Sequence, residues 1–450
     1  MCWVILTSAA AADKMSVVYA LATPAAKSAI CVFRVSGEGC LNKLSVLFGA
    51  ADIPPRLFSI RPFYNSGVLV DTVGVLVFSG KKSYTGEDSF EVHAHGGLGV
   101  MSLIVEAFDS VGFEEAPPGE FTKRAFLNNK IDLNEAESVL DVIDSTRADD
   151  VYLSSRSLSG EFSNKVHGFA SVINDLRMRV EGEIDFSDEG ESFMDEKIIS
   201  DLNFLVCDFE LFLGGCRNKK NMSVKNKVVF VGPVNSGKSS TFNRLLGFER
   251  ALISDIPGTT RDIIESEVFY SNLSFSLFDT AGIRNTDDSI EAMGIDYTKS
   301  EISNADVVVG VFDSPTDSSI DYFTSLVGDK GFIKVLNKID INKSEFGDFD
   351  CLISAKTGEG FDGFKKKIVS FFDKSSDESA TYLVRDRHII LFNDSIEALK
   401  KSLCILKSGE DLEIAAEELK ISRSCLDIVV GEKTPDGLLG DIFSNFCIGK

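Results

Sequence analysis

The stretch Gly232-Pro-Val-Asn-Ser-Gly-Lys-Ser239 decides the fold of the central part of this 450-residue chain. It fits the pattern G-x-x-x-x-G-K-S, follows the apolar run Val228–Val231 and precedes a helical pattern. A strand, a glycine-rich loop and a helix in this order form a P-loop, whose backbone N–H groups surround phosphate oxygens. We therefore predict a phosphate site in which Lys238 reaches the β- and γ-phosphates and Ser239 binds Mg²⁺.

Three further motifs follow the predicted strands Phe275–Phe278, Ile333–Leu336 and Cys351–Ile353. They are Asp279-Thr-Ala-Gly282, Asn337-Lys-Ile-Asp340 and Ser354-Ala-Lys356. The carboxylate of Asp279 is expected beside the metal. The carboxylate of Asp340 can accept from both N1–H and N2–H of guanine, a pair of donors that adenine lacks. The four motifs together predict a Ras-like GTP-binding module with a mostly parallel sheet.

The residue that orients the attacking water in Ras-like proteins has no counterpart at the same position here. The switch Gly258-Thr-Thr-Arg-Asp262 supplies Thr260 as a second Mg²⁺ ligand, but Ile283 stands where Ras-like proteins carry a glutamine. We expect a K⁺ ion near Asn235 and the backbone of Ser254–Thr259 to supply positive charge to the phosphates. The alternative for Asn235 is ordinary loop capping.

The flanking regions have a different character. Short strand patterns at Ile30–Val35, Val73–Phe78 and Phe90–His93, with a helix at Leu98–Val111, predict an α+β domain. One long helix is predicted from the apolar stripe Leu158, Phe162, Val166, Phe169, Ile173, Leu176, Val180 and Ile184. Another helix is predicted over Ile389–Leu406. A helical tail of this length cannot bury its apolar face alone, so we expect it to pack on the helices before residue 220.

The GTP-binding module is therefore predicted to be an insertion into a helical domain. The domains expected are residues 1–130 (α+β), 131–222 (helical, first part), 223–376 (GTP-binding) and 377–450 (helical, second part). The 46 Lys and Arg residues against 69 Asp and Glu give a net charge of −23, which argues against a general nucleic-acid surface. Nine cysteines without a C-x-x-C pair favour reduced thiols in a cytoplasmic protein.

Other classes of protein are disfavoured. His93 and His95 lack a set of Cys or His partners, so no zinc site is expected. No apolar run reaches the ~20 residues that span a bilayer, and the first 14 residues lack signal-peptide features, with Met15 a possible start.

Four stretches outside the nucleotide motifs carry a resemblance to a known family. They are Tyr84-Thr-Gly-Glu-Asp88, His95-Gly-Gly97, Pro118-Gly-Glu-Phe-Thr-Lys-Arg-Ala-Phe-Leu-Asn128 and the terminal Phe446-Cys-Ile-Gly-Lys450. With these the chain resembles the MnmE (TrmE) family of tRNA modification GTPases from about Val17 to Lys450. The resemblance implies an N-terminal folate-binding and dimerisation domain, a split helical domain and an inserted G domain.

The resemblance also implies an activity. A family member is a homodimeric, K⁺-stimulated GTP hydrolase that works with the FAD-dependent partner MnmG on tRNA. Together they add a carboxymethylaminomethyl or aminomethyl-type group to C5 of the wobble uridine, U34. A reduced folate of the 5-formyl- or methylene-tetrahydrofolate type supplies the one-carbon unit.

The residue roles that the resemblance implies are as follows. The GTP-binding positions, which include those predicted from the motifs above, are Asn235, Ser236, Gly237, Lys238, Ser239, Ser240, Ser254, Asp255, Ile256, Pro257, Gly258, Thr259, Thr260, Asp279, Thr280, Ala281, Gly282, Asn337, Lys338, Asp340, Ser354, Ala355 and Lys356. Mg²⁺ would be bound by Ser239 and Thr260, and K⁺ by Asn235, Ser254, Ile256 and Thr259. Glu291 would be the catalytic residue, Arg34, Glu91, Lys130 and Lys450 the folate ligands, and Cys447 a thiol near the folate.

Several alternatives stay open. Asp287 or Asp288 could replace Glu291, the four folate candidates could be surface charges, and Cys447 could be a small buried hydrophobe. The loop Ala25-Ala-Lys-Ser28 and the position of Pro233 depart from the family pattern. The runner-up is a GTPase of ribosome assembly or signalling, which would usually carry a basic RNA-binding appendage.

Overall fold

The computed structural model describes residues 16–49, 52–145, 147–186, 196–219, 226–233, 235–248, 265–270, 273–279, 300–314, 319–328, 330–341, 347–372, 380–408, 411–433, 436–446 and 448–449. The chain divides into two compact units. The first comprises Met1–Ile143, Ser154–Gly214 and Arg387–Lys450, and the second comprises Asp144–Leu153 and Gly215–Asp386.

The N-terminal part of the first unit is built on a six-stranded sheet in the order β3-β4-β5-β2-β1-β6. Its strands are β1 (Val18–Leu21), β2 (Ile30–Ser36), β3 (Ser59–Asn65), β4 (Val68–Phe78), β5 (Ser89–His95) and β6 (Glu114–Glu115). Helices α1 (Leu44–Phe48) and α2 (Leu98–Ser110) and the short 3-10 turns η1 (Cys40–Lys43) and η2 (Gly80–Lys82) accompany it. An aromatic core around Phe108 joins α2 to the sheet, and the predicted α+β character is confirmed.

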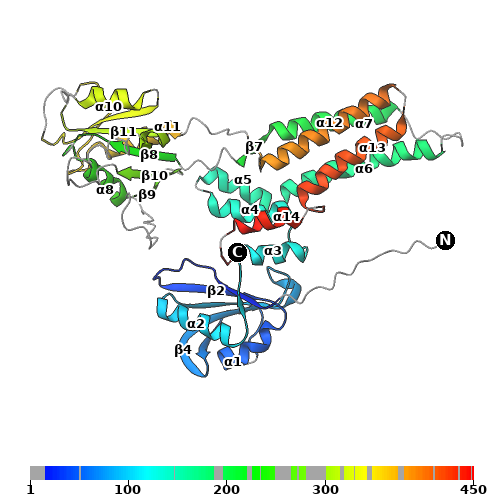
Figure 1. The fold of residues 1–450 in the computed structure, drawn as a ribbon, viewed down its shortest axis with the longest axis horizontal. Coiled ribbons are helices and arrows are strands. Elements are labelled where there is room, and N and C mark those ends of the chain that lie inside the picture. The colour runs from blue at the N-terminus through cyan, green and yellow to red at the C-terminus, as the bar shows by residue number, and fades with distance from the viewer. Residues whose placement is uncertain are drawn as a thin grey trace. The chain divides into compact units, whose positions relative to one another are not determined.

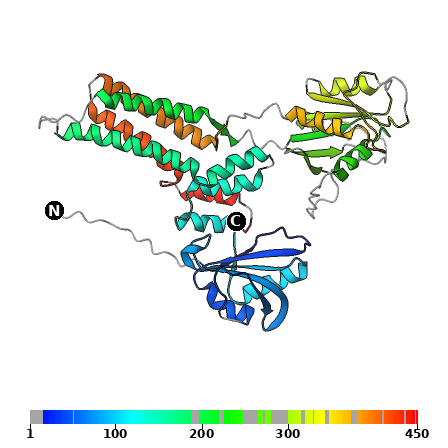
Figure 2. The ribbon, with the colours of Figure 1, turned by 180° about the vertical axis from the view of Figure 1, so that it is seen from behind.

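The rest of the first unit is helical. The helices here are α3 (Glu120–Leu127), α4 (Leu133–Asp144), α5 (Ala148–Leu158), α6 (Glu161–Phe186), α7 (Glu196–Gly214), α12 (Asp386–Ser408), α13 (Leu412–Val430) and α14 (Asp436–Ser444), and α5 belongs to the second unit up to Leu153. Helix α6 runs beside α13, and α7 beside α12 (Figures 1 and 2). The ring of Phe209 stacks on Phe169 at 4.5 Å and meets Phe392 at 5.4 Å. Helices from before and after the central module therefore share one core.

The prediction of one helix through Leu158 is wrong. Leu158 ends α5, and α6 begins at Glu161 after Gly160, whose φ of 84° is left-handed. The apolar spacing continues across this break because Leu158 and Phe162 are four residues apart, so periodicity alone could not detect it. The left-handed φ, which residues with a side chain rarely adopt, explains the glycine at this position.

The second unit contains a six-stranded sheet in the order β13-β12-β11-β8-β10-β9. Its strands are β8 (Asn226–Val231), β9 (Glu265–Tyr270), β10 (Leu273–Asp279), β11 (Val307–Phe312), β12 (Gly331–Leu336) and β13 (Cys351–Leu352), with helices α8 (Lys238–Phe248), α10 (Ser319–Val327) and α11 (Phe361–Phe372). All pairings are parallel except β9 with β10. Every residue of β11 is buried, as expected for a parallel strand covered on both faces. The predicted mostly parallel sheet is confirmed.

Two short strands lie where the chain enters and leaves this sheet. Strand β7 (Cys216–Asn218) pairs in parallel with β14 (Tyr382–Val384). Arg217 of β7 forms a buried ion pair with Asp150 at 3.3 Å, and Asn218 Nδ2 donates to Asp386 at 2.8 Å. The two ends of the central module are thus joined directly to each other.

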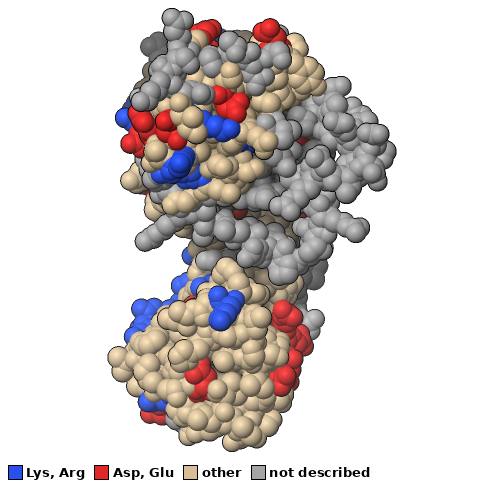
Figure 3. Space-filling model, turned by 90° about the vertical axis from the view of Figure 1, so that its left-hand side faces the viewer, with Lys and Arg blue, Asp and Glu red and all other residues tan. Residues whose placement is uncertain are grey.

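Surface charge is mixed. On the face drawn in Figure 3, Lys and Arg stand beside Asp and Glu, and the described residues visible there form no continuous basic area. None of the helices that the structure describes is long and apolar enough to cross a bilayer.

Candidate nucleotide-binding site

The loop after β8 has the backbone geometry of a close-approach turn. Gly232, Asn235 and Gly237 all have left-handed φ values, of 144°, 64° and 94°. A Cβ on Gly232 would lie 2.2 Å from the carbonyl oxygen of Val311, and one on Gly237 would lie 2.1 Å from Asn337 Nδ2. Only glycine fits at these two positions, so the loop can follow a tight path with its backbone exposed to a ligand.

Lys238 begins α8 directly after this loop. Its Nζ donates to the carbonyl oxygens of Gly232 and Pro233, both at 2.8 Å, so the ammonium lies over the loop. Ser239 and Ser240 are exposed on the first turn of the helix. A cation, a helix N-terminus and two hydroxyl side chains meet here, which suits a phosphate group and its metal ion.

Asn337 joins three loops that are far apart in the sequence. Its side chain is buried, and Nδ2 donates to the carbonyl oxygen of Ser236 at 3.0 Å. Its Oδ1 accepts from the backbone N–H of Ala355 at 2.9 Å. The loop after β8, the loop after β12 and the loop after β13 therefore form one edge of the sheet, at the carboxyl ends of its strands.

Asp340 and Lys338 are held by neighbours from other loops. Ser354 Oγ donates to Asp340 Oδ1 at 2.7 Å, which fixes the carboxylate that the sequence assigns to guanine. Lys338 Nζ donates to the carbonyl oxygen of Asn235 and pairs with Asp313, both at 2.7 Å. The base-reading and phosphate-binding candidates are thus connected to each other through hydrogen bonds.

Arg244 of α8 was missed by sequence reasoning. Its Nη1 donates to the carbonyl oxygens of Ala355 at 2.8 Å and Lys356 at 2.7 Å. Its guanidinium lies over the ring of Phe361 at 5.8 Å. No local pattern marks this arginine, because its partners follow more than a hundred residues later.

Part of the candidate site lies outside the described residues. This holds for Ser254, Asp255, Ile256, Pro257, Gly258, Thr259, Thr260, Thr280, Ala281, Gly282 and Glu291, and at the C-terminus for Cys447 and Lys450. Of Asp279 only its backbone position, at the end of β10, is described.

Two of the four folate candidates meet on the N-terminal sheet. Arg34 Nε donates to Glu91 Oε1 at 3.0 Å across β2 and β5, and Arg34 Nη1 donates to the carbonyl oxygen of Gly449 at 3.2 Å. The C-terminal segment next to Lys450 therefore reaches this pair. His93 Nε2 is buried without a hydrogen bond, 3.5 Å from Glu91.

Lys130 lies elsewhere in the described part of the chain. Its Nζ donates to the carbonyl oxygen of Lys81 at 2.8 Å. The residue lines a hollow of about 470 Å³ together with Phe126, Asn129, Ile131, Asp132, Glu135, Val430, Gly431 and Glu432. The structure brings Arg34 and Glu91 together but not Lys130 with them.

The motifs that carry the family resemblance in the N-terminal part form an internal network. Arg124, buried in α3, donates to Glu120 at 2.8 Å, to Glu87 at 3.1 Å and to the carbonyl oxygen of Ser36. Ser36 Oγ in turn donates to Glu87 at 2.9 Å and lies 2.6 Å from Thr85 Oγ1. These side chains satisfy one another and leave little for a ligand.

Three cysteines have raised pKa values. Burial, with smaller contributions from Asp88 and Glu87, raises the pKa of Cys40 to about 12. Burial likewise raises the pKa of Cys216 to about 12 and that of Cys351 to about 11. The seven cysteines that the structure describes form no disulfide, and no group of three His, Cys, Asp or Glu residues in the described part is arranged to hold a metal ion.

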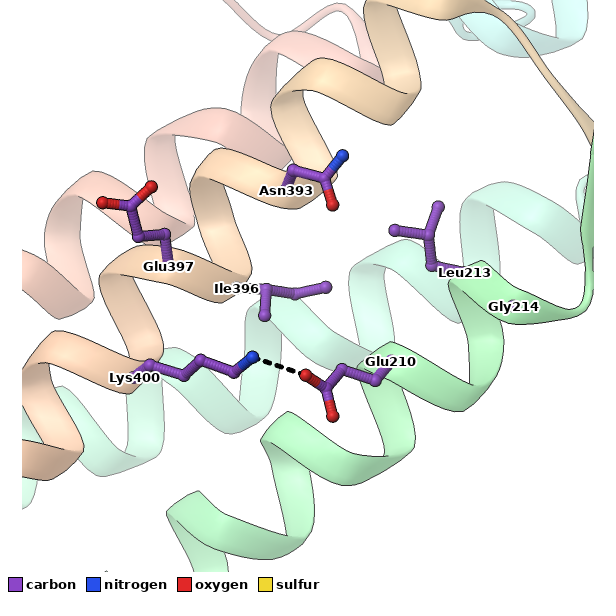
Figure 4. A pocket seen from close by; sticks show the side chains of 7 residues that line it. All are labelled: Glu210, Leu213, Gly214, Asn393, Ile396, Glu397 and Lys400. Carbon is purple, nitrogen blue, oxygen red and sulfur yellow. Dashed lines mark ion pairs between the residues drawn. The ribbon is translucent and has the colours of Figure 1, made fainter.

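A second hollow, of about 440 Å³, lies between α7 and α12 (Figure 4). Glu210 and Lys400 form an ion pair of 2.6 Å across it, and Leu213 and Ile396 line its apolar side. Its charged residues include this ion pair, and none of the residues that line it belongs to the nucleotide loops.

Comparison with known proteins covers nearly the whole chain. A family model described as the MnmE helical domain matches residues 133–447, and one described as the GTP-binding protein TrmE N-terminus matches residues 17–130. The tRNA modification GTPase MnmE of Nitrosospira multiformis is 37% identical, over 97% of this chain and 100% of that protein. The protein of the same name from Nitrosomonas eutropha is 36% identical, over 96% and 98%. Among solved structures, the G domain of the T. maritima FeoB iron transporter is 27% identical, over 32% of this chain and 98% of that chain, with a TM-score of 0.27.

Proposed function

The chain belongs to the MnmE family of tRNA modification GTPases, and from this premise we propose that it hydrolyses GTP as a step in the modification of tRNA. The observation that carries the proposal is the single edge formed by the three nucleotide loops around Asn337, with Lys238 and Asp340 on it. Phosphate binding at one end and base reading at the other are what a GTPase requires.

We assign roles to the residues of this edge. Lys238 and the N-terminus of α8 neutralise the β- and γ-phosphates, and Asp340 accepts from the guanine edge. Ser239 and Thr260 would hold Mg²⁺, which adds charge stabilisation when bound. The left-handed glycines Gly232 and Gly237 support a phosphate here, because they let the loop turn tightly against Val311 and Asn337 directly before the N-terminus of α8.

K⁺ would be held by Asn235, Ser254, Ile256 and Thr259. Asn235, exposed and left-handed beside the phosphate loop, is compatible with that role. We expect GTP turnover by the full chain to be much faster in K⁺ than in Na⁺ at equal ionic strength. Equal rates would refute the K⁺ assignment and leave the hydrolase proposal standing.

Glu291 is proposed to orient the attacking water, since Ile283 cannot. Glu291→Ala should slow single-turnover hydrolysis by roughly 10²–10³ with GTP affinity nearly intact. Asp287→Ala and Asp288→Ala are matched controls in the same segment. A normal rate for Glu291→Ala together with a slow rate for either control would move the role to that aspartate.

The N-terminal region is proposed as the folate-binding and dimerisation domain, with Arg34, Glu91, Lys130 and Lys450 as folate ligands and Cys447 as a nearby thiol. The buried Nε2 of His93, which has no hydrogen bond and lies 3.5 Å from Glu91, supports a polar ligand at this sheet. Arg34 and Glu91 already form an ion pair. A bound folate would therefore contact two charged groups that also contact each other.

The wider proposal has four further parts. The expected domain ranges are those given from the sequence, the protein works as a cytoplasmic homodimer, and an FAD-dependent partner of the MnmG type joins it. The product is a C5-substituted wobble uridine in tRNA.

Nucleoside analysis of tRNA from cells lacking this protein tests the substrate. Loss of a C5-substituted wobble uridine is expected, and an unchanged nucleoside profile would favour the ribosome-assembly alternative. Binding of 5-formyl-tetrahydrofolate to the full chain, compared with Arg34→Ala and Glu91→Gln variants, tests the folate site separately.

A further inference from the structure

Arg244 connects the two ends of the nucleotide site. It lies in α8, the helix whose first residue is Lys238, and its Nη1 donates to two carbonyl oxygens of the loop that carries Ser354, Ala355 and Lys356. One rigid helix therefore holds a phosphate-binding lysine at its start and an anchor for the base loop a turn and a half later.

The hydrogen bonds around Arg244 form a closed circuit. From the arginine the circuit runs to Ala355, whose N–H donates to Asn337. Asn337 in turn donates to the carbonyl oxygen of Ser236, in the loop that leads back into α8. A branch leads from Ser354 to Asp340, the carboxylate assigned to guanine. Displacement of Arg244 would remove two hydrogen bonds that hold this loop to α8.

The surroundings of Arg244 are built for an arginine. Gly358 has a left-handed φ of 91°, and a Cβ there would lie 2.4 Å from Arg244 Nη2. The ring of Phe361 supports the guanidinium from α11. Lysine could reach only part of this arrangement, because it lacks the planar group that contacts the ring.

We propose that Arg244 is a positioning residue for guanine selection, an inference that rests on the proposed function as a GTPase. Arg244 fixes the loop of residues 354–356 against the phosphate-binding helix, and through Ser354 this loop holds Asp340 in register with the base. In this role the arginine acts through the loop and not on the nucleotide directly. Its loss should therefore weaken recognition of the base edge more than the chemistry of hydrolysis.

The experiment uses the full-length protein and its Arg244→Ala, Arg244→Lys and Asn243→Ala variants. Asn243 is the exposed neighbour on α8 and serves as the matched control. Affinities for GDP and IDP are measured by competition against a fluorescent GDP analogue, with melting curves alongside. IDP lacks the 2-amino group, so the ratio of the two affinities reports the contact of Asp340 with that group.

For Arg244→Ala we expect GDP affinity to fall about tenfold, the effect of losing charge-assisted hydrogen bonds. The preference for GDP over IDP should shrink at least threefold, and kcat at saturating GTP should stay within about twofold. Arg244→Lys should fall between the parent and Arg244→Ala, and Asn243→Ala should match the parent. Equal weakening of GDP and IDP, or unchanged affinity, would overturn the proposal.

Gly358→Ala gives a second test that keeps the arginine. The added Cβ should push the guanidinium from its carbonyl partners and reduce the preference for GDP over IDP in the same direction. A full preference in this folded variant would contradict the proposal. The parent protein tests the underlying function separately: if it binds GDP no better than ADP, the proposed GTPase function fails and this inference fails with it. A parent that prefers GDP while Arg244→Ala keeps the full preference refutes this inference alone.

Discussion

The N-terminal network around Arg124 and the nucleotide loops around Asn337 use similar residue types in opposite ways. In the first, polar side chains turn inward and satisfy each other, as Arg124, Glu87 and Ser36 do. In the second, left-handed loop residues expose backbone groups at a sheet edge, and Ser236 and Thr241 keep buried hydroxyls without a partner. The comparison teaches that a sequence motif can mark a scaffold as well as a binding site.

The largest effect is expected from breaking the scaffold. Arg124→Met would leave Glu87 and Glu120 without their shared cation and should destabilise the N-terminal region by about 3–5 kcal/mol. Hydrogen exchange of amides in β2 and β5 measures this locally, which is necessary in a chain with several cooperative units.

The neighbouring Lys123 gives the matched control for that experiment. It reaches Glu120 only at 3.9 Å and is 47% exposed. Lys123→Met should change protection by less than about 0.5 kcal/mol. Similar exchange rates in both variants would mean that the Arg124 network is not the scaffold described above.

The second effect concerns the site itself and should leave the fold intact. Asp340→Asn replaces the acceptor for guanine by an amide, so GTP affinity should fall by about 10²-fold while xanthosine nucleotides gain. The introduced amide oxygen can still accept from Ser354, so the loop keeps its contact. Titration with GDP and XDP checks this, and unchanged GDP binding would remove the base-reading role of Asp340.

The third prediction is a substitution that should stabilise the protein. Thr241 is fully buried in α8, and its hydroxyl has no partner. Thr241→Val keeps the shape and removes an unsatisfied group, so local stability should rise by about 1 kcal/mol. The control Thr324→Val removes an exposed hydroxyl that donates to Ile320 and should not stabilise. Lower protection of α8 in Thr241→Val would show that the hydroxyl has a stabilising partner.

The smallest expected effect is a change of folding stability with pH. Burial alone would raise the pKa of Asp71, but hydrogen bonds from His95 and Thr72 outweigh it and lower that pKa. A lowered pKa in the folded state contributes stability above the unfolded value of about 3.9 and loses it as the pH falls through the folded value. The stability difference between the parent and Asp71→Asn should therefore shrink below about pH 4. A difference that stays constant from pH 5 to pH 2.5 would contradict this.

Much of the fold follows from local pattern. The strands β8, β11 and β12 and the loop at Gly232–Ser239 could be predicted because each is encoded by consecutive residues. Short strands such as β7 and β14 could not, because three residues carry no periodicity and their pairing joins positions far apart in the chain. The break at Gly160 was missed because the helical spacing runs across it.

The residues of the candidate site also fall into two groups, those that a local motif predicts and those that it does not. Lys238, Asp340 and Ser354 stand in contiguous motifs, and the structure puts hydrogen bonds between their loops. Arg244 owes its role to partners brought near by folding, so no spacing in the sequence reveals it. For Arg124 the sequence shows only the i,i+4 spacing to Glu120, and its contacts with Glu87 and Ser36 also depend on the fold. The pairing of Arg34 with Glu91 was likewise not predicted, because it depends on the register of β2 against β5.

The parallel pairing of β7 with β14 has a mechanical consequence. Parallel neighbours need a long crossover connection, and here the whole central sheet with its helices is that crossover. The two ends of the module can therefore separate only if the hydrogen bonds between β7 and β14 break. Arg217 bound to Asp150 and Asn218 bound to Asp386 add a side-chain contact to each side of this closure, so the module begins and ends at one shared point of the chain.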